Sequence, residues 1–169
     1  MAIRIDALRS AATRQATVVA RSSNEARTLG VKTAFLCHSH HDADLAKGLV
    51  HLLSDADWRV YIDWQDAEMP NTPNRETAQR IKQKIIDLDF FLVLATQNSM
   101  ASRWCPWEIG YADGNKQLDR ILIVPTEDGA QTHGNEYLQL YRQINLSDKN
   151  ELAVWQPGQN TDGVLVKNL

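Results

Sequence analysis

The fold is decided by residues 90–95, which read FFLVLA. All six positions are apolar, which is the pattern of a strand that helices cover on both faces. Segments with helical spacing of leucine or isoleucine lie between this run and others like it. The alternation predicts an α/β fold, with a flavodoxin-like open parallel sheet of about five strands and helices on both faces. The other predicted strands are residues 33–37, 59–63, 120–124 and 143–146.

Proline sets two boundaries within this pattern. Pro125 follows the fourth run and is expected to end that strand, because proline cannot donate a backbone hydrogen bond to a neighbouring strand. Pro73 suits the first position of a helix, and Thr72 is the expected N-cap of that helix.

Composition excludes several classes of protein. The chain has 169 residues, of which 43% are apolar and 23% charged, so it is neither disordered nor of low complexity. A net charge of −3 argues against a nucleic-acid partner. No apolar run reaches the roughly 18 residues of a membrane span, so no membrane partner is expected. Two cysteines, Cys37 and Cys105, are too few for a disulfide scaffold and indicate a reducing, cytoplasmic location.

Residues 1–29 differ in charge from the rest of the chain. They hold five arginines against two acidic residues, and apolar side chains recur at three- and four-residue steps from Ile5 to Val19. This spacing predicts one basic amphipathic helix, packed on the main domain or on a second copy. An organelle-targeting segment and a disordered segment are the alternatives. The chain is therefore divided into this helix, residues 1–29, and a domain over residues 30–169.

Three loops of the predicted domain concentrate reactive and aromatic residues. They follow the first three strands and comprise residues 37–42, 63–71 and 96–108. Ligands of open parallel sheets bind at the carboxyl ends of the strands, so these loops are expected to form one cleft.

Trp104 and Glu108 are the most informative pair in these loops. They lie four residues apart, so a helix places them on one face. An indole stacks on a flat cationic ring, and an adjacent carboxylate can hold ribose hydroxyls and stabilise an oxocarbenium-like centre. The alternative is a tryptophan-rich helix packed in the core, with Glu108 as a solvated acid in its first turn.

The first loop, CHSHH at residues 37–41, allows several interpretations. A contact with phosphate or ribose beside the N-terminus of the next helix competes with a plain surface loop. A metal site is disfavoured because the sequence has no distant second cluster of ligands. Cys37 or Cys105 could act as a nucleophile beside a histidine, although cysteine is more often buried than reactive.

Several common catalytic motifs are absent from the sequence. The chain contains no GxxxxGKS/T, GxGxxG or GxSxG pattern. Their absence argues against ATP hydrolysis, Rossmann-type redox chemistry and α/β-hydrolase catalysis.

Four segments, in order, resemble a Toll/interleukin-1 receptor (TIR) domain of bacterial type. They read TAFLCHSHHD, WRVYIDWQDAEMPN, FFLVLATQNSMAS and SRWCPWEIGYA, and the likeness covers residues 32–146. The Ser-x-Trp-Cys-x-x-Glu pattern of the last segment is the most specific part. The TIR fold is a flavodoxin-like parallel sheet, which agrees with the strands predicted above.

The resemblance implies roles for individual residues. In enzymatic members of the family the glutamate of this pattern is catalytic, and it corresponds to Glu108. The tryptophan that stacks on the nicotinamide ring corresponds to Trp104, while Trp107 immediately precedes the catalytic acid. Positions in the loops that border the dinucleotide correspond to Phe35, His38, Ser39, Asp63 and Trp64.

The resemblance also implies an activity. The protein would be an NAD glycohydrolase or cyclase, cleaving the nicotinamide–ribose bond of NAD to nicotinamide and ADP-ribose or a cyclic or conjugated ADP-ribose. Bacterial members of this kind serve antiphage defence, as in Thoeris-like systems, where the product signals to an effector protein. NAD would be the substrate, no metal or other cofactor is expected, and the active form would be a homo-oligomer or filament. A non-enzymatic TIR interaction module and a nucleoside deoxyribosyltransferase-like enzyme are the alternatives.

Overall fold

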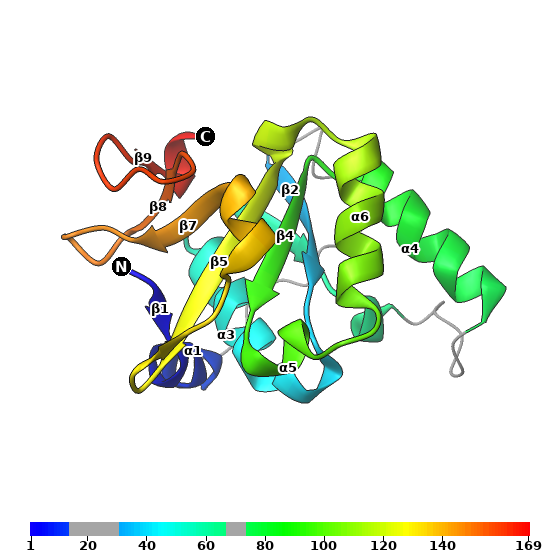
Figure 1. Ribbon diagram of the computed structural model, residues 1–169, viewed down its shortest axis with the longest axis horizontal. Coiled ribbons are helices and arrows are strands. Elements are labelled where there is room, and N and C mark those ends of the chain that lie inside the picture. Colours follow the sequence, from blue (N-terminus) through cyan, green and yellow to red (C-terminus); the bar gives the residue numbers. More distant parts are fainter. Residues whose placement is uncertain (14–30, 67–73) are drawn as a thin grey trace.

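The expected parallel sheet is present in a computed structural model that describes residues 1–13, 31–66 and 74–169 (Figure 1). Five of its strands pair in parallel in the order β3-β2-β4-β5-β7. In chain order this is the 2-1-3-4-5 arrangement of flavodoxin-like folds, so the predicted fold class is confirmed. The sheet reverses its winding direction between β2 and β4. The five strands are β2 (Lys32–Cys37), β3 (Trp58–Tyr61), β4 (Phe90–Ala95), β5 (Ile121–Asp128) and β7 (Arg142–Leu146).

Four further strands widen this sheet, so the described residues contain more strands than the sequence pattern predicted. β1 (Ile3–Arg4) pairs in parallel with the far end of β5, and β6 (Gln131–Thr132) pairs antiparallel with β5. β8 (Leu152–Trp155) and β9 (Val164–Leu165) continue the sheet beyond β7 as antiparallel strands. Three of the four have only two residues, which is too short to show a period in the sequence.

Helices cover both faces of the sheet, as predicted (Figure 1). One face carries α1 (Ile5–Ala12) and α3 (Ala43–Ser54), and the other carries α4 (Arg75–Asp87) and α6 (Cys105–Asn115). The short α5 (Gln97–Met100) directly follows β4. Within the described residues, no helix is both long and apolar enough to cross a membrane. The described 3₁₀ turns are η1 (His40–Asp42), η2 (Asp63–Gln65), η3 (Leu118–Arg120), η4 (Glu136–Leu140) and η5 (Val166–Asn168).

The register of the strands assigns each side chain to one face of the sheet. Leu36 and Leu92 lie side by side on β2 and β4 and pack in the core under α1 and α3. Phe35 and Phe91, one residue earlier, pack in the second core under α4 and α6. Successive side chains of a strand point to opposite faces, so a sheet that is covered twice requires the continuous apolar runs seen in the sequence.

The N-terminal residues belong to the same core. Ile3 and Leu8 are fully buried. Helix α1 lies so close to α3 that a Cβ atom on Gly48 would be 2.0 Å from the carbonyl oxygen of Leu8, so only glycine fits there. The predicted division between residues 29 and 30 lies outside the described residues and stays a prediction.

The fourth predicted strand does not end at Pro125, and this prediction was wrong. β5 continues to Asp128, because Thr126 and Glu127 pair with β1. The hydroxyl of Thr126 also donates a hydrogen bond to the carbonyl oxygen of Ala95 at 2.6 Å. The N-terminal strand therefore supplies a pairing partner that the sequence pattern around the proline did not reveal.

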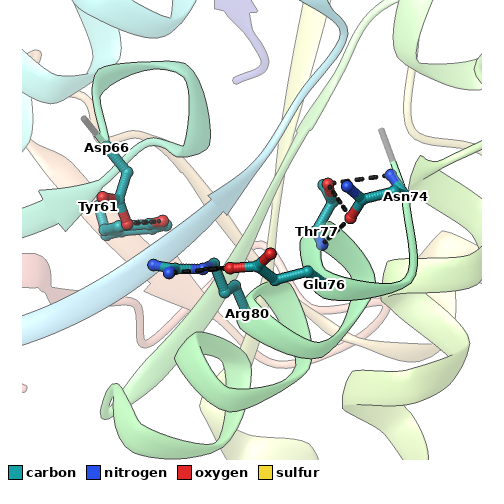
Figure 2. Close-up of polar contacts among 6 residues, drawn as sticks. All are labelled: Tyr61, Asp66, Asn74, Glu76, Thr77 and Arg80. Atoms are coloured by element: carbon teal, nitrogen blue, oxygen red, sulfur yellow. Dashed lines mark hydrogen bonds and ion pairs between the residues drawn. The ribbon is translucent and has the colours of Figure 1, made fainter. Parts of the chain in front are cut away.

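Helix α4 begins later than predicted and has a different N-cap (Figure 2). Thr72 and Pro73 lie outside the described residues. Asn74 is the N-cap: its Oδ1 accepts a hydrogen bond from the N–H of Thr77 at 3.0 Å, and Thr77 Oγ1 accepts one from the N–H of Asn74 at 3.1 Å. This reciprocal pair satisfies two backbone N–H groups that the start of a helix leaves unpaired.

Candidate active site

Loops at the carboxyl ends of β2, β3 and β4 meet where the sheet reverses direction. Asp42 is buried in η1 and accepts hydrogen bonds from Thr96 Oγ1 at 2.5 Å and Asn98 Nδ2 at 2.7 Å. These bonds join the loop after β2 to the start of α5. His38 Nε2 lies 3.9 Å from Asp63 Oδ1, which brings the same loop against η2 after β3. The structure thus brings together the loops that the sequence predicted to share one site.

Helix α6 begins at this end of the sheet and carries the predicted catalytic pair (Figure 1). Trp104 is the N-cap residue, and Pro106 lies in the first turn, where a missing N–H costs no hydrogen bond. The Ser102 hydroxyl accepts hydrogen bonds from the N–H groups of Trp104 at 3.1 Å and Cys105 at 3.3 Å. Glu108 occupies the same first turn, where the helix dipole stabilises a negative charge.

Glu108 is a buried acid, with 6% of the residue exposed. Burial raises its pKa well above the usual value, the neighbouring Cys37 side chain lowers it, and the nearby Cys105 and Asp63 raise it further. The pKa of this carboxyl group therefore lies above that of an exposed glutamate. Such a group can change its charge when a cation arrives beside it.

Trp104 is partly open to solvent, with 37% of the residue exposed. Its ring meets Trp107 edge-on, with centroids 5.5 Å apart and an angle of 89° between the planes. Trp107 in turn stacks on Tyr111, and the ammonium group of Lys82 lies 5.6 Å from the Trp107 centroid. The alternative interpretation of the helix had its tryptophans packed in the core and Glu108 exposed to solvent. The structure shows the opposite for this pair, because Glu108 is buried and Trp104 is partly exposed.

His38 and Ser39 follow β2 and are both buried. His38 Nδ1 lies 2.9 Å from the carbonyl oxygen of Leu36, so in the neutral ring this nitrogen carries the proton and Nε2 is an acceptor. Burial lowers the pKa of His38, which favours that neutral form. Nε2 is buried and has no hydrogen-bond partner among the described residues. Ser39 has a structural contact, because its hydroxyl accepts the N–H of His41 at 3.3 Å and caps η1.

Asp63 and Trp64 lie beside this histidine. Asp63 Oδ1 accepts the N–H of Trp64 at 2.9 Å, which fixes the carboxylate at the start of η2. The Trp64 ring contacts His38 edge-on, with centroids 4.4 Å apart. Asp63 and Trp64 therefore both lie against His38 of the first loop.

Phe35 is not brought to the site. The residue is 1% exposed, and its ring stacks on Phe91 with centroids 5.6 Å apart and contacts Tyr61 at 5.7 Å. Its position two residues before the end of β2 directs the side chain into the core under α4 and α6. In this conformation Phe35 supports the sheet and cannot touch a substrate.

Side-chain contacts fix the described residues on either side of the second loop (Figure 2). On the β3 side, the Tyr61 hydroxyl donates a hydrogen bond to Asp66 at 2.6 Å. On the α4 side, Arg80 pairs with Glu76 at 3.1 Å, beside the capping box already described. The predicted loop over residues 63–71 lies only partly within the described residues, which end at Asp66 on this side.

Two residues that the sequence interpretation did not assign to substrate also lie at this site. Cys37 and Cys105 are buried, and both affect the pKa of Glu108. Sequence spacing could have indicated one of these neighbours, since Cys105 precedes Glu108 by three residues and shares its helix face. Burial raises the pKa of Cys37 well above the usual value, which argues against its use as a nucleophile. Within the described ranges, no three histidine, cysteine, aspartate or glutamate side chains are grouped as metal ligands.

Comparison with known proteins identifies the fold. Residues 34–156 match the family model for the TIR domain, and this span covers most of the chain, including the loops after β2, β3 and β4. The chain belongs to the TIR domain family. The resemblance seen in the four sequence segments is thereby confirmed.

Two curated proteins are similar to this TIR domain. A protein of Bacillus cereus, named as a probable 3′ cyclic ADP-D-ribose synthase, ThsB′, is 34% identical over 110 residues, which is 63% of this chain and 57% of that protein. A protein of Cytobacillus dafuensis, named as a candidate cyclic ADP-D-ribose synthase, TIR2, is 23% identical over 140 residues, which is 80% of this chain and 34% of that protein. The matches thus span only about half and a third of the relatives' lengths.

Proposed function

We propose that this TIR domain cleaves the nicotinamide–ribose bond of NAD and converts the remainder to a cyclic ADP-ribose. The observation that carries the proposal is the buried Glu108 carboxyl group at the start of α6, one turn from the half-exposed Trp104. A module that only assembles with other proteins needs neither a carboxyl group with a raised pKa nor an open indole beside it. The names of the two similar proteins point to the same reaction.

The chemistry follows from the charge of the substrate. The nicotinamide ring of NAD is a cation, and an indole face attracts a flat cation. We assign this contact to Trp104. The ring of Trp107 packs edge-on against the Trp104 ring, and Lys82 of α4 lies over the ring of Trp107. When the C–N bond breaks, its electron pair goes to the ring nitrogen, so nicotinamide leaves neutral and the ribose becomes an oxocarbenium-like cation.

We assign to Glu108 the role of stabilising the positive charge that develops on the ribose. A carboxylate placed before the bond breaks stabilises this charge without reorganisation. Its raised pKa favours the neutral acid in the free protein, whereas a bound cation favours the charged form. His38 Nε2 is a buried acceptor without a partner among the described residues and suits a ribose hydroxyl as donor. Ser39 follows it in the same loop, and Asp63 faces it from η2.

The product depends on which nucleophile captures the cation. Water gives ADP-ribose, whereas a hydroxyl or an adenine nitrogen of the same molecule gives a cyclic product. We propose the cyclic product because both relatives are named for it. The reaction needs no metal or further cofactor, because the leaving group is already cationic and departs neutral.

The direct test is incubation with NAD followed by chromatography and mass spectrometry. Nicotinamide release is expected together with a product that is lighter than ADP-ribose by one water. Glu108→Gln should lower the rate by about a thousandfold, because the stabilising charge is lost while the size of the side chain is kept. Glu76→Gln, which changes an exposed acid on α4, is the matched control and should leave the rate unchanged.

Three results would overturn the assignment. A folded Glu108→Gln protein that still releases nicotinamide at the wild-type rate would remove Glu108 from the mechanism. A wild-type protein with no turnover of NAD at any concentration would instead favour the interaction module, and turnover of nucleosides alone would favour the deoxyribosyltransferase-like alternative.

The partners of the protein complete the proposal. We propose that the active form is a homo-oligomer or filament in the cytoplasm, and that its cyclic product binds an effector protein in antiphage defence. Specific activity that rises steeply with protein concentration is expected if a second copy completes the site. Activity strictly proportional to protein at all concentrations would contradict self-assembly.

A further inference from the structure

A side-chain hydrogen bond closes the turn that follows β3 (Figure 2). The Tyr61 hydroxyl, at the end of β3, donates to Asp66 Oδ2 at 2.6 Å. Between the two residues lies η2, which is closed by a hydrogen bond from the N–H of Asp66 to the carbonyl oxygen of Asp63 at 3.1 Å. The backbone bond fixes the shape of the turn, whereas the side-chain bond ties the far end of the turn back to the sheet.

The ring of Tyr61 is itself anchored by neighbouring elements. It contacts Phe35 with centroids 5.7 Å apart, and Phe35 stacks on Phe91 in the core under α4 and α6. The ammonium group of Lys84 on α4 lies 4.8 Å from the centroid of the Tyr61 ring. Burial and the hydrogen bond with Asp66 both raise the pKa of the Tyr61 hydroxyl, so it keeps its proton and remains a donor. The two central strands and α4 therefore determine where this donor lies.

The turn that the bond closes carries two residues of the candidate site. Asp63 Oδ1 lies 3.9 Å from His38 Nε2, and the Trp64 ring contacts the His38 ring with centroids 4.4 Å apart. His38 belongs to the loop after β2, whereas η2 follows β3. These contacts between two loops therefore depend on where η2 lies relative to the sheet.

We propose that Tyr61 is a positioning residue, whose hydrogen bond to Asp66 holds η2 against His38. In this position Asp63 and Trp64 stay beside the Nε2 acceptor to which a ribose hydroxyl is assigned. The identity of the substrate rests on the proposed function, whereas the position of the turn can be measured in the free protein.

A second tyrosine offers a matched comparison. The Tyr141 hydroxyl donates to Asp113 Oδ1 at 2.7 Å and so joins the residue before β7 to the C-terminal part of α6. The chemical groups are the same as in the first pair. This second bond lies at the amino ends of the parallel strands, whereas η2 lies at their carboxyl ends.

The experiment compares Tyr61→Phe, which removes the hydroxyl and keeps the ring, with Tyr141→Phe. In the full chain without substrate, nuclear magnetic resonance measures the Overhauser effects between ring protons of Trp64 and His38, identified by their absence in Trp64→Phe. These effects are expected in the wild type and in Tyr141→Phe. They should be lost in Tyr61→Phe, because the turn is no longer tied to β3.

Steady-state kinetics with NAD gives the second measurement. In Tyr61→Phe, KM should rise about tenfold, as expected for one lost hydrogen bond to a charged group. The value of kcat should stay near that of the wild type, because the displaced residues hold the ribose in the ground state and the transition state alike. Tyr141→Phe should leave both constants unchanged, although it loses the same type of hydrogen bond.

Substitutions of Asp66 test the same bond from its other end. Asp66→Ala removes the acceptor and should reproduce both changes, whereas Asp66→Asn keeps an oxygen acceptor and should recover most of each. The double variant Tyr61→Phe/Asp66→Ala should be no worse than either single variant, because all three lack the same bond. If Tyr61→Phe does not fold, the two Asp66 variants replace it in the comparison.

The outcomes separate this proposal from the proposed function. Overhauser effects and KM that are the same in Tyr61→Phe as in the wild type would overturn the role of Tyr61, and so would a lost effect with an unchanged KM in an active enzyme. Equal changes in Tyr141→Phe would also overturn it, because a general loss of stability would then explain them. A wild-type protein that does not cleave NAD would contradict the proposed function, while the Overhauser effects would still test whether Tyr61 positions the turn.

Discussion

Helices cover both faces of the sheet, but the cores beneath them contain different kinds of side chain. Under α1 and α3 the core consists of aliphatic and aromatic side chains, and the Trp58 indole N–H there is satisfied by the Val166 carbonyl oxygen at 3.1 Å. Under α4 and α6 the core also holds Cys37 and Cys105, with the Glu108 carboxyl group beside them. A buried carboxyl group is costly, and among the described residues this one lies against the core under α4 and α6.

This difference teaches which part of the molecule stabilises the fold and which part is available for chemistry. The face under α1 and α3 is packed so closely that a single methyl group does not fit at Gly48. Gly110 in α6 is instead exposed, and an added Cβ there would meet nothing within 4 Å. The same substitution at these two glycines should therefore have opposite effects.

The largest expected effect on stability comes from Gly48→Ala. The added Cβ would lie 2.0 Å from a backbone oxygen of Leu8, so α1 must move away from α3. We expect the free energy of unfolding to fall by about 3 kcal/mol, at the upper end of overpacking costs. Urea unfolding followed by circular dichroism measures this change.

The matched substitution is Gly110→Ala on the exposed side of α6. Alanine favours the helix over glycine, so the free energy of unfolding should rise by roughly 0.5–1 kcal/mol. A loss of stability at both glycines would show that the cost at Gly48 does not come from the close approach of α1 and α3.

The second effect in size concerns the exposed indole beside the site. Trp104→Ala should raise the KM for NAD about tenfold, because stacking of one ring on an aromatic side chain contributes about 1–3 kcal/mol. Trp104→Phe should keep part of this affinity. Ile86→Ala, a control at an exposed apolar residue on α4, should leave KM unchanged. An unchanged KM in Trp104→Ala would place the nicotinamide ring elsewhere.

The smallest effect tests the buried carboxyl group through stability alone. An acid whose pKa is raised in the folded state binds its proton more tightly there than in the unfolded chain. Its contribution to stability is therefore greatest below the ordinary glutamate pKa and is lost as pH rises through the folded-state pKa. As pH rises above the ordinary glutamate pKa of about 4, the free energy of unfolding of the wild type should fall relative to that of Glu108→Gln. Parallel curves for the two proteins would show that Glu108 is not perturbed by burial.

The sequence was sufficient to predict the central part of the fold. The apolar runs around β2, β4 and β5 are continuous because both faces are covered, and this pattern is specific to such strands. The pairing of β1 with β5 was not predictable, because a two-residue strand has no period and its partner lies more than a hundred residues away. Pro125 was misleading for the same reason.

The site was predictable in position but not in environment. The spacing of Trp104 and Glu108 placed them on one helix turn, and the loops after β2 and β3 were correctly expected to meet. The burial of Glu108 depends on how α6 docks on β2, which no local pattern records. Phe35 could have been assigned to the core from strand alternation, since it lies two positions before the buried Cys37.

The hydrogen bond from Trp58 to Val166 links residues 108 positions apart, and β1 can pair only after the end of β5 has been synthesised. During synthesis on the ribosome, β1 therefore has no partner until residues 126 and 127 have been made. Contacts between such distant parts of a chain slow folding. The nascent protein is consequently expected to acquire its native structure, and any enzymatic activity, only after Val166 has left the ribosome.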